Sequence, residues 1–287
     1  MPSISPGRYR QPVSITRSRS SIVVFSGVDG VLRSPHTTAF TRAAAALRQL
    51  ADDDTALVLC SGKTRAELEF VQQKLDITHP FICENGGGVI IPNGYFEFDV
   101  PNARNIAWCQ AVEFGRPYTD VVDILHRTAD RLRIAIVAFS DMSIEDVARE
   151  CQLPLLQARL AKLRECEELF RLIDPSATAR SRLFKALDAA SLRPREGGRF
   201  DRVGAPVDSK AGVNLLTGLY RRSRGDLITV GVTHTTPGDN LLRLVDHAIM
   251  AADDNTGDES IDVVDWADAI VDRVRGLREK QTTSGHI

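Results

Sequence analysis

Residues 22–32 read Ile-Val-Val-Phe-Ser-Gly-Val-Asp-Gly-Val-Leu (IVVFSGVDGVL), an apolar run that ends in a turn carrying one carboxylate. The unbroken apolar stretch at 22–25 is typical of a strand buried on both faces of a parallel sheet. Asp29 and Gly30 end it, because both residue types favour tight turns. Ligands of open α/β sheets bind at the carboxyl ends of the strands, so this turn is a candidate site.

Strands and helices alternate on both sides of the middle of the chain. Apolar periodicity predicts strands at 22–25, 56–60, 227–232 and 248–251, and helices at 39–50, 66–75, 211–220 and 241–245. The alternation predicts an α/β fold in which both parts build one Rossmann-type parallel sheet.

The middle of the chain has a different pattern. Amphipathic helical stretches at 119–131, 144–149, 155–164 and 180–190 surround one predicted strand at 134–139. We therefore predict an α+β cap at 94–195, inserted into a core domain formed by 21–93 and 196–276. The polar ends, residues 1–20 and 277–287, are predicted to be disordered.

Composition narrows the classes of partner. The chain has 287 residues, 43% of them hydrophobic, which is enough for a sizeable core, and 36 basic against 38 acidic residues give a net charge of −2. This balance provides no overall field for nucleic acid or an anionic membrane, so an anion site must be local. No apolar run approaches the roughly 18 residues of a membrane span, and no secretory signal begins the chain. We expect a soluble, cytoplasmic protein.

The five cysteines are odd in number, widely spaced and free of any CxxC pair. This pattern disfavours a disulfide framework or a zinc site and predicts reduced structural thiols.

Five segments resemble, in the same order, segments of mannosyl-3-phosphoglycerate phosphatases, a family of haloacid dehalogenase-like hydrolases. They are CSGKTRAELE (60–69), ENGGGVIIP (84–92), FSDMS (139–143), LAKLRE (160–165) and GGRF (197–200). The turn after the first strand is similar to the loop in which those hydrolases usually carry Asp-x-Asp-Gly. The resemblance spans about residues 20–275 and implies a Rossmann-like core with a cap over the site.

The resemblance also points to a missing nucleophile. In the family the first aspartate of Asp-x-Asp attacks phosphorus and forms an acyl-phosphate. That position is Gly27 here, which has no side chain to attack with. Asp29 matches the family's general acid/base, and the alternative is a carboxylate that only stabilises the turn.

Three residues match the family's phosphate-binding groups. Ser61 corresponds to the hydroxyl that contacts the transferring phosphoryl group, and Lys63 lies just beyond it. Lys210 corresponds to the lysine that neutralises charge on the attacked group. The alternatives are a helix N-cap for Ser61 and a surface position for Lys210. Together they predict a local anion seat.

The loop after the strand at 227–232 departs from the family pattern. Members carry Gly-Asp-x-x-x-Asp there, and the two carboxylates hold Mg²⁺, whereas this chain has His234 and Gly238, with Asp239 one residue late. Imidazole is a poor ligand for this hard cation. We therefore expect no metal cofactor, with Asp29 and Asp239 as ligands if a metal binds at all. His234 is a second candidate proton carrier, or an unpaired core histidine.

Residues of the cap and of the glycine-rich segment complete the predicted site. Arg164 and Glu165 match residues that face the substrate, and Arg199 lies near the return to the core. The alternative for these charges is a solvated helix surface. Asn85 and Gly86 belong to a segment whose glycines let the backbone approach a ligand, or only form a tight turn.

Two functions remain open. Loss of the nucleophile and of both acidic positions favours a protein that binds a small anionic metabolite between core and cap without hydrolysing it. It would be either a pseudoenzyme or a repurposed isomerase, lyase or cyclase in which Asp29 or His234 moves a proton. The alternative is a Mg²⁺-dependent phosphatase acting on mannosyl-3-phosphoglycerate or a related sugar or glycerate phosphate. The sequence does not identify a protein partner.

Overall fold

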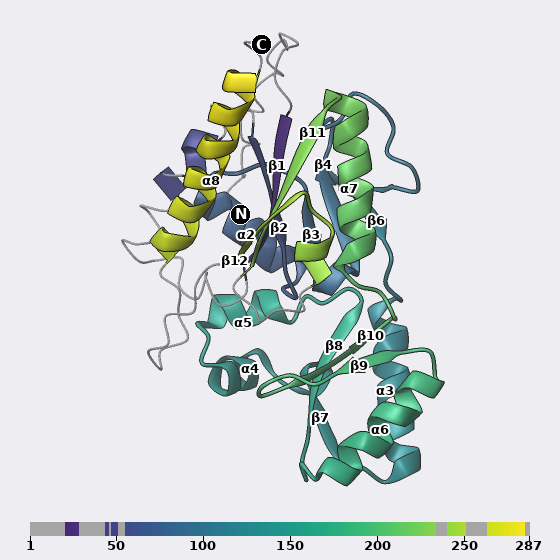
Figure 1. Cartoon of the computed structure of the whole chain (residues 1–287). Coiled ribbons are helices and arrows are strands. Elements are labelled where there is room, and N and C mark those ends of the chain that lie inside the picture. Colours follow the sequence, from purple (N-terminus) through teal and green to yellow (C-terminus); the bar gives the residue numbers. More distant parts are fainter. Residues whose placement is uncertain are drawn as a thin grey trace.

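The computed structural model describes residues 21–28, 44–45, 47–50, 55–233, 240–250 and 263–284, which form two β-sheets with helices packed against them (Figure 1). The larger sheet has eight strands in the order β12-β11-β1-β2-β3-β4-β6-β5. Its strands are β1 (Ser21–Gly27), β2 (Thr55–Cys60), β3 (Phe81–Cys83), β4 (Gly88–Pro92), β5 (Arg104–Ile106), β6 (Cys109–Glu113), β11 (Leu227–Thr233) and β12 (His247–Met250).

The strands from β12 to β3 run parallel to one another, as predicted. All six residues of β2 are buried, and so are the first six residues of β1. Alternate residues of β1 therefore enter two different cores. Ile22 and Val24 pack on the face covered by α2 (Arg65–Leu75) and α8 (Val263–Ser284), and Val23 and Phe25 pack on the face covered by α7 (Ser209–Arg224) (Figure 1).

The second sheet has four antiparallel strands and lies beyond the carboxyl ends of the parallel strands (Figure 1). Its strands, in spatial order, are β7 (Ile136–Ala138), β8 (Glu167–Leu172), β10 (Asp201–Gly204) and β9 (Arg193–Arg195). The helices of this part are α3 (Tyr118–Leu132), α4 (Ile144–Cys151), α5 (Leu155–Ala161) and α6 (Ala177–Ala189). We call residues 118–204 the cap.

The sheets divide the chain at other residues than the predicted 94 and 195. β5 and β6 extend the larger sheet to Glu113, because β6 pairs antiparallel with the buried strand β4. β9 and β10 belong to the cap sheet, since β10 pairs with β8. These strands have three to five residues each, too few to show a clear alternation.

Two local predictions also differ from the structure. The expected helix at 241–245 is only a short 3₁₀ turn, η3 (Asn240–Arg243). The tail expected from residue 277 onward is helical as far as Ser284, because Leu277 continues the buried stripe of Ile270 and Val274. All five cysteines are free thiols, as predicted. Within the described residues, no helix is both long and apolar enough to cross a membrane.

A chain of side-chain hydrogen bonds joins the segment before β3 to α7. His79 Nδ1 lies 2.8 Å from the Tyr95 hydroxyl, which lies 2.9 Å from the hydroxyl of the fully buried Tyr220. Burial, with a smaller contribution from the positive charge of Arg224, lowers the pKa of His79 to about 4. The imidazole is therefore neutral in the folded protein at pH values where the unfolded chain takes up a proton.

This histidine should make the free energy of unfolding depend on pH. Above about pH 6.5 both states hold a neutral His79, and between about pH 6.5 and 4 only the unfolded state binds the proton, so stability falls as the pH falls through this window. We expect a loss on the order of 2 kcal/mol between pH 7 and 4.5 that His79→Asn lacks, because the Asn amide does not titrate. Urea unfolding of both proteins at the two pH values measures the difference. Equal pH dependence in both would contradict the assignment.

Candidate functional site

The site lies where β1 and β2 end side by side. Gly27, the last residue of β1, is opposite Cys60, the last residue of β2. Gly27 is half-buried and is followed by the fully buried Val28. Asp29, predicted as the acid/base, lies outside the described residues, so its position stays a prediction. At the carboxyl end of β1, Gly27 itself therefore presents backbone atoms only.

The loop after β2 leads from Ser61 into α2. Thr64 is the N-cap of that helix, because its hydroxyl accepts a hydrogen bond from Glu67 N (3.1 Å) and the Glu67 carboxylate accepts one from Thr64 N (2.8 Å). Ser61 is thus not the cap, which the sequence left open. Its buried hydroxyl accepts from Lys63 N at 3.0 Å. The Lys63 ammonium lies 3.9 Å from Glu67.

The glycine-rich segment after β3 packs against this loop. Glu84 N donates to Lys63 O and Asn85 N donates to Ser61 O, both at 3.0 Å. Glu84, Asn85 and Gly86 have φ values of 45°, 55° and 98° in succession. Residues in the left-handed region store strain, which often marks functional loops. This segment, η1 (Glu84–Gly86), therefore connects the Ser61 loop to the rest of the site.

At Gly86 the glycine-rich segment contacts the start of α7. A Cβ atom on Gly86 would lie 2.3 Å from the carbonyl of Asp208, so only glycine fits this contact. Asp208 is the N-cap of α7 and accepts from Lys210 N at 3.0 Å. The Lys210 residue itself is exposed. The structure thus gathers the backbone around Ser61, Asn85, Gly86 and Lys210 at one edge of the sheet.

The Glu84 carboxylate holds the cap to the core. Its side chain is 0% exposed and accepts from the backbone N–H groups of residues 165–167, at 2.7, 3.0 and 2.7 Å. Three N–H groups converging on one carboxylate resemble the backbone concavities that bind anions. The carboxylate of the core residue Glu84 therefore occupies the concavity formed by these three N–H groups of the cap.

Arg164 belongs to the same junction rather than to the cap surface. Its guanidinium donates to Glu167 Oε2 (3.0 Å) and to the Gly62 carbonyl (3.0 Å). Burial opposes its charge, but Glu167 and Glu84 outweigh burial and raise the pKa of Arg164. Burial raises the pKa of Glu167, and the positive charge of Arg164 partly opposes this increase. The alternative of a solvated surface arginine is therefore wrong, and this guanidinium is engaged within the protein.

The remaining predicted cap residues lie apart from one another. Glu165 bridges to Arg65 of α2, with a nearest distance of 2.6 Å, so it also joins cap to core. Arg199 lies between β9 and β10 and pairs with Glu150 of α4 at 3.2 Å. Its side chain is 56% exposed, and no contact links it to the Ser61 loop in the described part of the chain.

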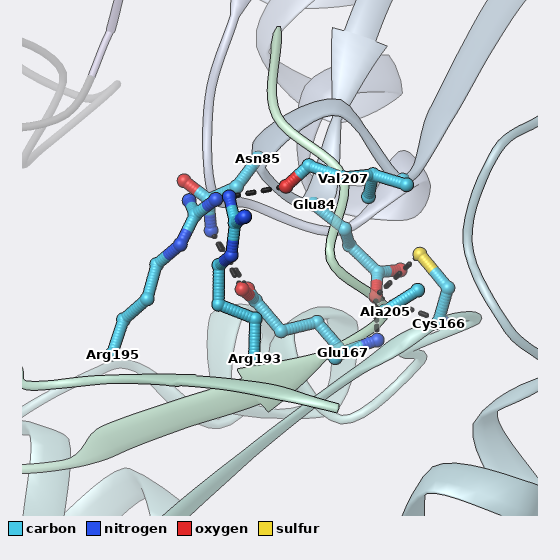
Figure 2. A pocket seen from close by; sticks show the side chains of 10 residues that line it. Glu84, Asn85, Cys166, Glu167, Arg193, Arg195, Ala205 and Val207 are labelled. Carbon is cyan, nitrogen blue, oxygen red and sulfur yellow. Dashed lines mark hydrogen bonds between the residues drawn. The ribbon is translucent and has the colours of Figure 1, made fainter. Parts of the chain in front are cut away.

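A pocket lies between the glycine-rich segment and the cap sheet (Figure 2). It is lined by Glu84, Asn85, Gly87, Cys166, Glu167, Arg193, Arg195, Gly204, Ala205 and Val207. Arg193 and Arg195 extend from β9 toward Asn85 (Figure 2). The sequence reasoning missed both arginines. The signal that could have found them is the Arg-x-Arg spacing, which puts two cations on one face of a strand.

No metal centre can be built from the residues that the structure describes, since they contain no group of three or more His, Cys, Asp or Glu side chains placed to hold an ion. The predicted candidates His234, Gly238 and Asp239 lie outside those residues, as does Asp29. The sequence-based expectations for them stay predictions.

Comparison with known proteins finds phosphatases among the proteins to which this chain is similar. Residues 24–101 match a family model described as haloacid dehalogenase-like hydrolase. A glucosyl-3-phosphoglycerate/mannosyl-3-phosphoglycerate phosphatase of Methanococcoides burtonii is 33% identical over 225 residues, which are 78% of this chain and 82% of the relative. A protein of the same name from Persephonella marina is 29% identical over 244 residues, 84% and 89% of the two chains.

Solved structures show the same fold at low identity. A haloacid dehalogenase-like hydrolase from Bacteroides thetaiotaomicron matches with a TM-score of 0.56 at 12% identity, over 88% of this chain and 100% of that one. A protein from Thermoplasma acidophilum matches with a TM-score of 0.54 at 14% identity, over 89% and 98%. The predicted fold class, a Rossmann-type core with an inserted α+β cap, is confirmed.

Proposed function

The chain belongs to the glucosyl-3-phosphoglycerate/mannosyl-3-phosphoglycerate phosphatase family of haloacid dehalogenase-like hydrolases, and on this basis we propose that it hydrolyses the phosphate ester of a hexosyl-3-phosphoglycerate or a related sugar or glycerate phosphate. One structural observation supports the proposal most. Gly86 fits between the Ser61 loop and the start of α7 without room for a side chain, which keeps the residues matched to phosphate binding together beneath a cap.

The hypothesis of a non-hydrolytic metabolite-binding protein is wrong. It rested on the loss of the nucleophile at position 27 and of both acidic metal positions, and it is overturned by relatives of 33% and 29% identity that align over most of both chains and are named as phosphatases. The backbone frame around Ser61 and Gly86 does not depend on the side chain at position 27.

Because Gly27 stands at the nucleophile position, the hydrolysis that we propose differs from the family's attack by an aspartate. With no carboxylate at this position, an aspartyl-phosphate cannot form there. We propose that water attacks phosphorus directly. A bond forms between the water oxygen and phosphorus, and the bond from phosphorus to the ester oxygen breaks. One water proton passes to the Asp29 carboxylate, which afterwards releases it to solvent, and the leaving oxygen takes up a proton from solvent water. Ser61 and Lys210 would hold the phosphoryl oxygens and stabilise their charge.

Phosphatases of this type generally use Mg²⁺, which needs hard oxygen ligands. The described residues do not fit such a site by themselves, because Gly27 offers only its carbonyl oxygen. Asp29 and Asp239 are the carboxylates that the family pattern leaves for a metal, and both lie outside the described residues. The proposed steps above therefore involve only residues of the chain and water.

The proposal is tested by phosphate release. We expect the purified protein with Mg²⁺ to release phosphate from mannosyl-3-phosphoglycerate or glucosyl-3-phosphoglycerate. Ser61→Ala should lower the turnover number about 10²-fold, as for loss of one donor to a developing charge. Cys60→Ala, a change at the neighbouring buried thiol, is the control and should retain activity. Release no faster than that of an Asp29→Asn variant would overturn the proposed function.

A further inference from the structure

One peptide unit of the core connects the cap to the Ser61 hydroxyl. The carbonyl of Gly62 accepts a hydrogen bond from Arg164 Nη2 at 3.0 Å. The N–H group of the same peptide unit belongs to Lys63 and donates to Ser61 Oγ at 3.0 Å. Because a peptide unit is planar, its carbonyl and its N–H group turn together. A change at the carbonyl end therefore moves the donor that holds the Ser61 hydroxyl.

The two neighbouring carbonyls of this loop are held by the core. Ser61 O accepts from Asn85 N at 3.0 Å. Lys63 O accepts from Glu84 N at the same distance. The Gly62 carbonyl, between them, accepts instead from a side chain of the cap. Glycine has no Cβ whose contacts would fix the direction of this carbonyl, so the orientation of the Gly62–Lys63 peptide depends on the cap.

The cap holds the Arg164 guanidinium in a fixed place. Its Nε donates to the Glu167 carbonyl at 2.6 Å, and its Nη2 donates to Glu167 Oε2 at 3.0 Å. The side chain is 2% exposed, and the Glu84 carboxylate lies 3.9 Å from Nη2. Burial alone would lower the pKa of Arg164, but Glu167 and Glu84 outweigh burial and keep the guanidinium charged. The Gly62 carbonyl therefore faces a rigid, charged donor.

The hydrogen bond from Lys63 N affects what the Ser61 hydroxyl can do. A hydroxyl has one proton and two lone pairs, so an oxygen that accepts from Lys63 N can also donate to a phosphoryl oxygen. The positive charge of Arg164 at the carbonyl end polarises the peptide and strengthens the N–H donor at its other end. Ser61 is buried, and in such surroundings these hydrogen bonds are stronger than in water.

We propose that Arg164 is a positioning residue, which orients the Ser61 hydroxyl toward the phosphoryl group through the Gly62–Lys63 peptide. The anion seat of Ser61 and Lys210 is therefore complete only while the cap is docked on the core. The family resemblance implied that Arg164 faces the substrate, whereas in this proposal it acts on the loop that holds the substrate. The inference rests on the proposed function, because it requires a phosphoryl group at Ser61.

A double-mutant cycle tests whether Arg164 acts through Ser61. Calorimetry measures binding of inorganic phosphate to the wild-type chain, to Arg164→Lys, to Ser61→Ala and to the double variant. Lysine keeps the buried charge but lacks the planar fork, so it does not hold the Gly62 carbonyl in the same orientation. We expect each single change to weaken binding roughly tenfold, as for the loss of one hydrogen bond to an anion.

The double variant should bind phosphate within about twofold of Ser61→Ala, because without the hydroxyl nothing remains for Arg164 to orient. The matched control is Arg65→Lys. Arg65 also joins core and cap, through Glu165, and this variant should bind phosphate as the wild type does.

Hydrogen exchange at single backbone amides gives a readout that needs no ligand. In Arg164→Lys the Lys63 amide should exchange roughly tenfold faster, because its hydrogen bond to Ser61 Oγ is loosened. The Glu67 amide, which donates to the N-cap residue Thr64, should exchange at an unchanged rate. A merely structural role of Arg164 would accelerate both amides. In the wild type the Lys63 amide should be protected, and unprotected exchange there would overturn the proposal even if no variant at position 164 folds.

The outcomes distinguish this inference from the proposed function. If the cycle shows that Arg164 acts through Ser61 but no phosphate ester is hydrolysed, the positioning role stands and the proposed hydrolysis fails. If an ester is hydrolysed but Arg164→Lys weakens phosphate binding equally with and without the Ser61 hydroxyl, the hydrolysis stands and the positioning role is overturned. Phosphate binding by Arg164→Lys as tight as that of the wild type, or no measurable binding to the wild type, would also overturn the positioning role.

Discussion

Gly86→Ala should destabilise the protein by about 3–5 kcal/mol and remove phosphate binding. The alanine Cβ would lie 2.3 Å from the Asp208 carbonyl and 2.6 Å from Ser209 N, both of them backbone groups. The residue also has φ = 98°, a conformation that L side chains rarely adopt. Overpacking and backbone strain each cost about 1–3 kcal/mol, and here they act at one position. The start of α7 must shift, which moves Lys210 away from Ser61.

The control for Gly86→Ala is Gly94→Ala. Gly94 also has positive φ, at 72°, but a Cβ there meets nothing within 4 Å. It therefore reports backbone strain without a clash and should cost only about 1 kcal/mol. Urea unfolding gives both values, and calorimetry with inorganic phosphate gives the binding. Equal effects of the two substitutions would contradict the close contact between Gly86 and Asp208.

Glu84→Gln is expected to loosen the junction of core and cap and to cost about 3–5 kcal/mol, as for breaking a buried ion pair by removing one partner. The carboxylate accepts three backbone N–H groups from residues 165–167 and has Arg164 Nη2 at 3.9 Å. A glutamine amide has one acceptor oxygen where the carboxylate has two. At least one buried N–H group would face a donor and lose its hydrogen bond.

Glu165→Gln provides the matched comparison for this prediction. Glu165 also joins cap to core, through Arg65, but its side chain is 36% exposed and that of Arg65 is 25% exposed. Solvent-exposed pairs contribute about 1 kcal/mol or less, so this change should be mild. Hydrogen exchange at the amides of residues 165–167 is the direct readout and should accelerate strongly only in Glu84→Gln. Unchanged protection there would refute the assigned role of Glu84.

Local sequence patterns were sufficient for the elements with strong periodicity. The apolar runs of β1 and β2 and the amphipathic stretches of α2, α3 and α7 each occupy a continuous segment, so their spacing is visible without knowledge of the fold. Short strands such as β5 and β9 have three residues each and show no period. For this reason the predicted boundaries at 94 and 195 do not coincide with the sheets.

The residues of the predicted site also fall into two groups, those visible in local sequence segments and those whose role depends on distant partners. Ser61, Asn85, Gly86 and Lys210 could be singled out because they belong to segments that resemble a known family in linear order. The environment of Arg164 could not be predicted, because its partners include the carbonyl of Gly62, 102 positions away. The pairing of Arg195 with Arg202 across two strands was equally hidden.

By itself, then, the sequence of this protein determined its fold class, its family and the loops that carry phosphate-binding residue types, since these depend on residues that are neighbours along the chain. Only the tertiary structure decided that Glu84 and Arg164 join the two domains and that the arginines of β9 face Asn85. Such contacts link positions about 80 or more residues apart, and which distant groups meet depends on how the sheets are ordered and packed rather than on any local period.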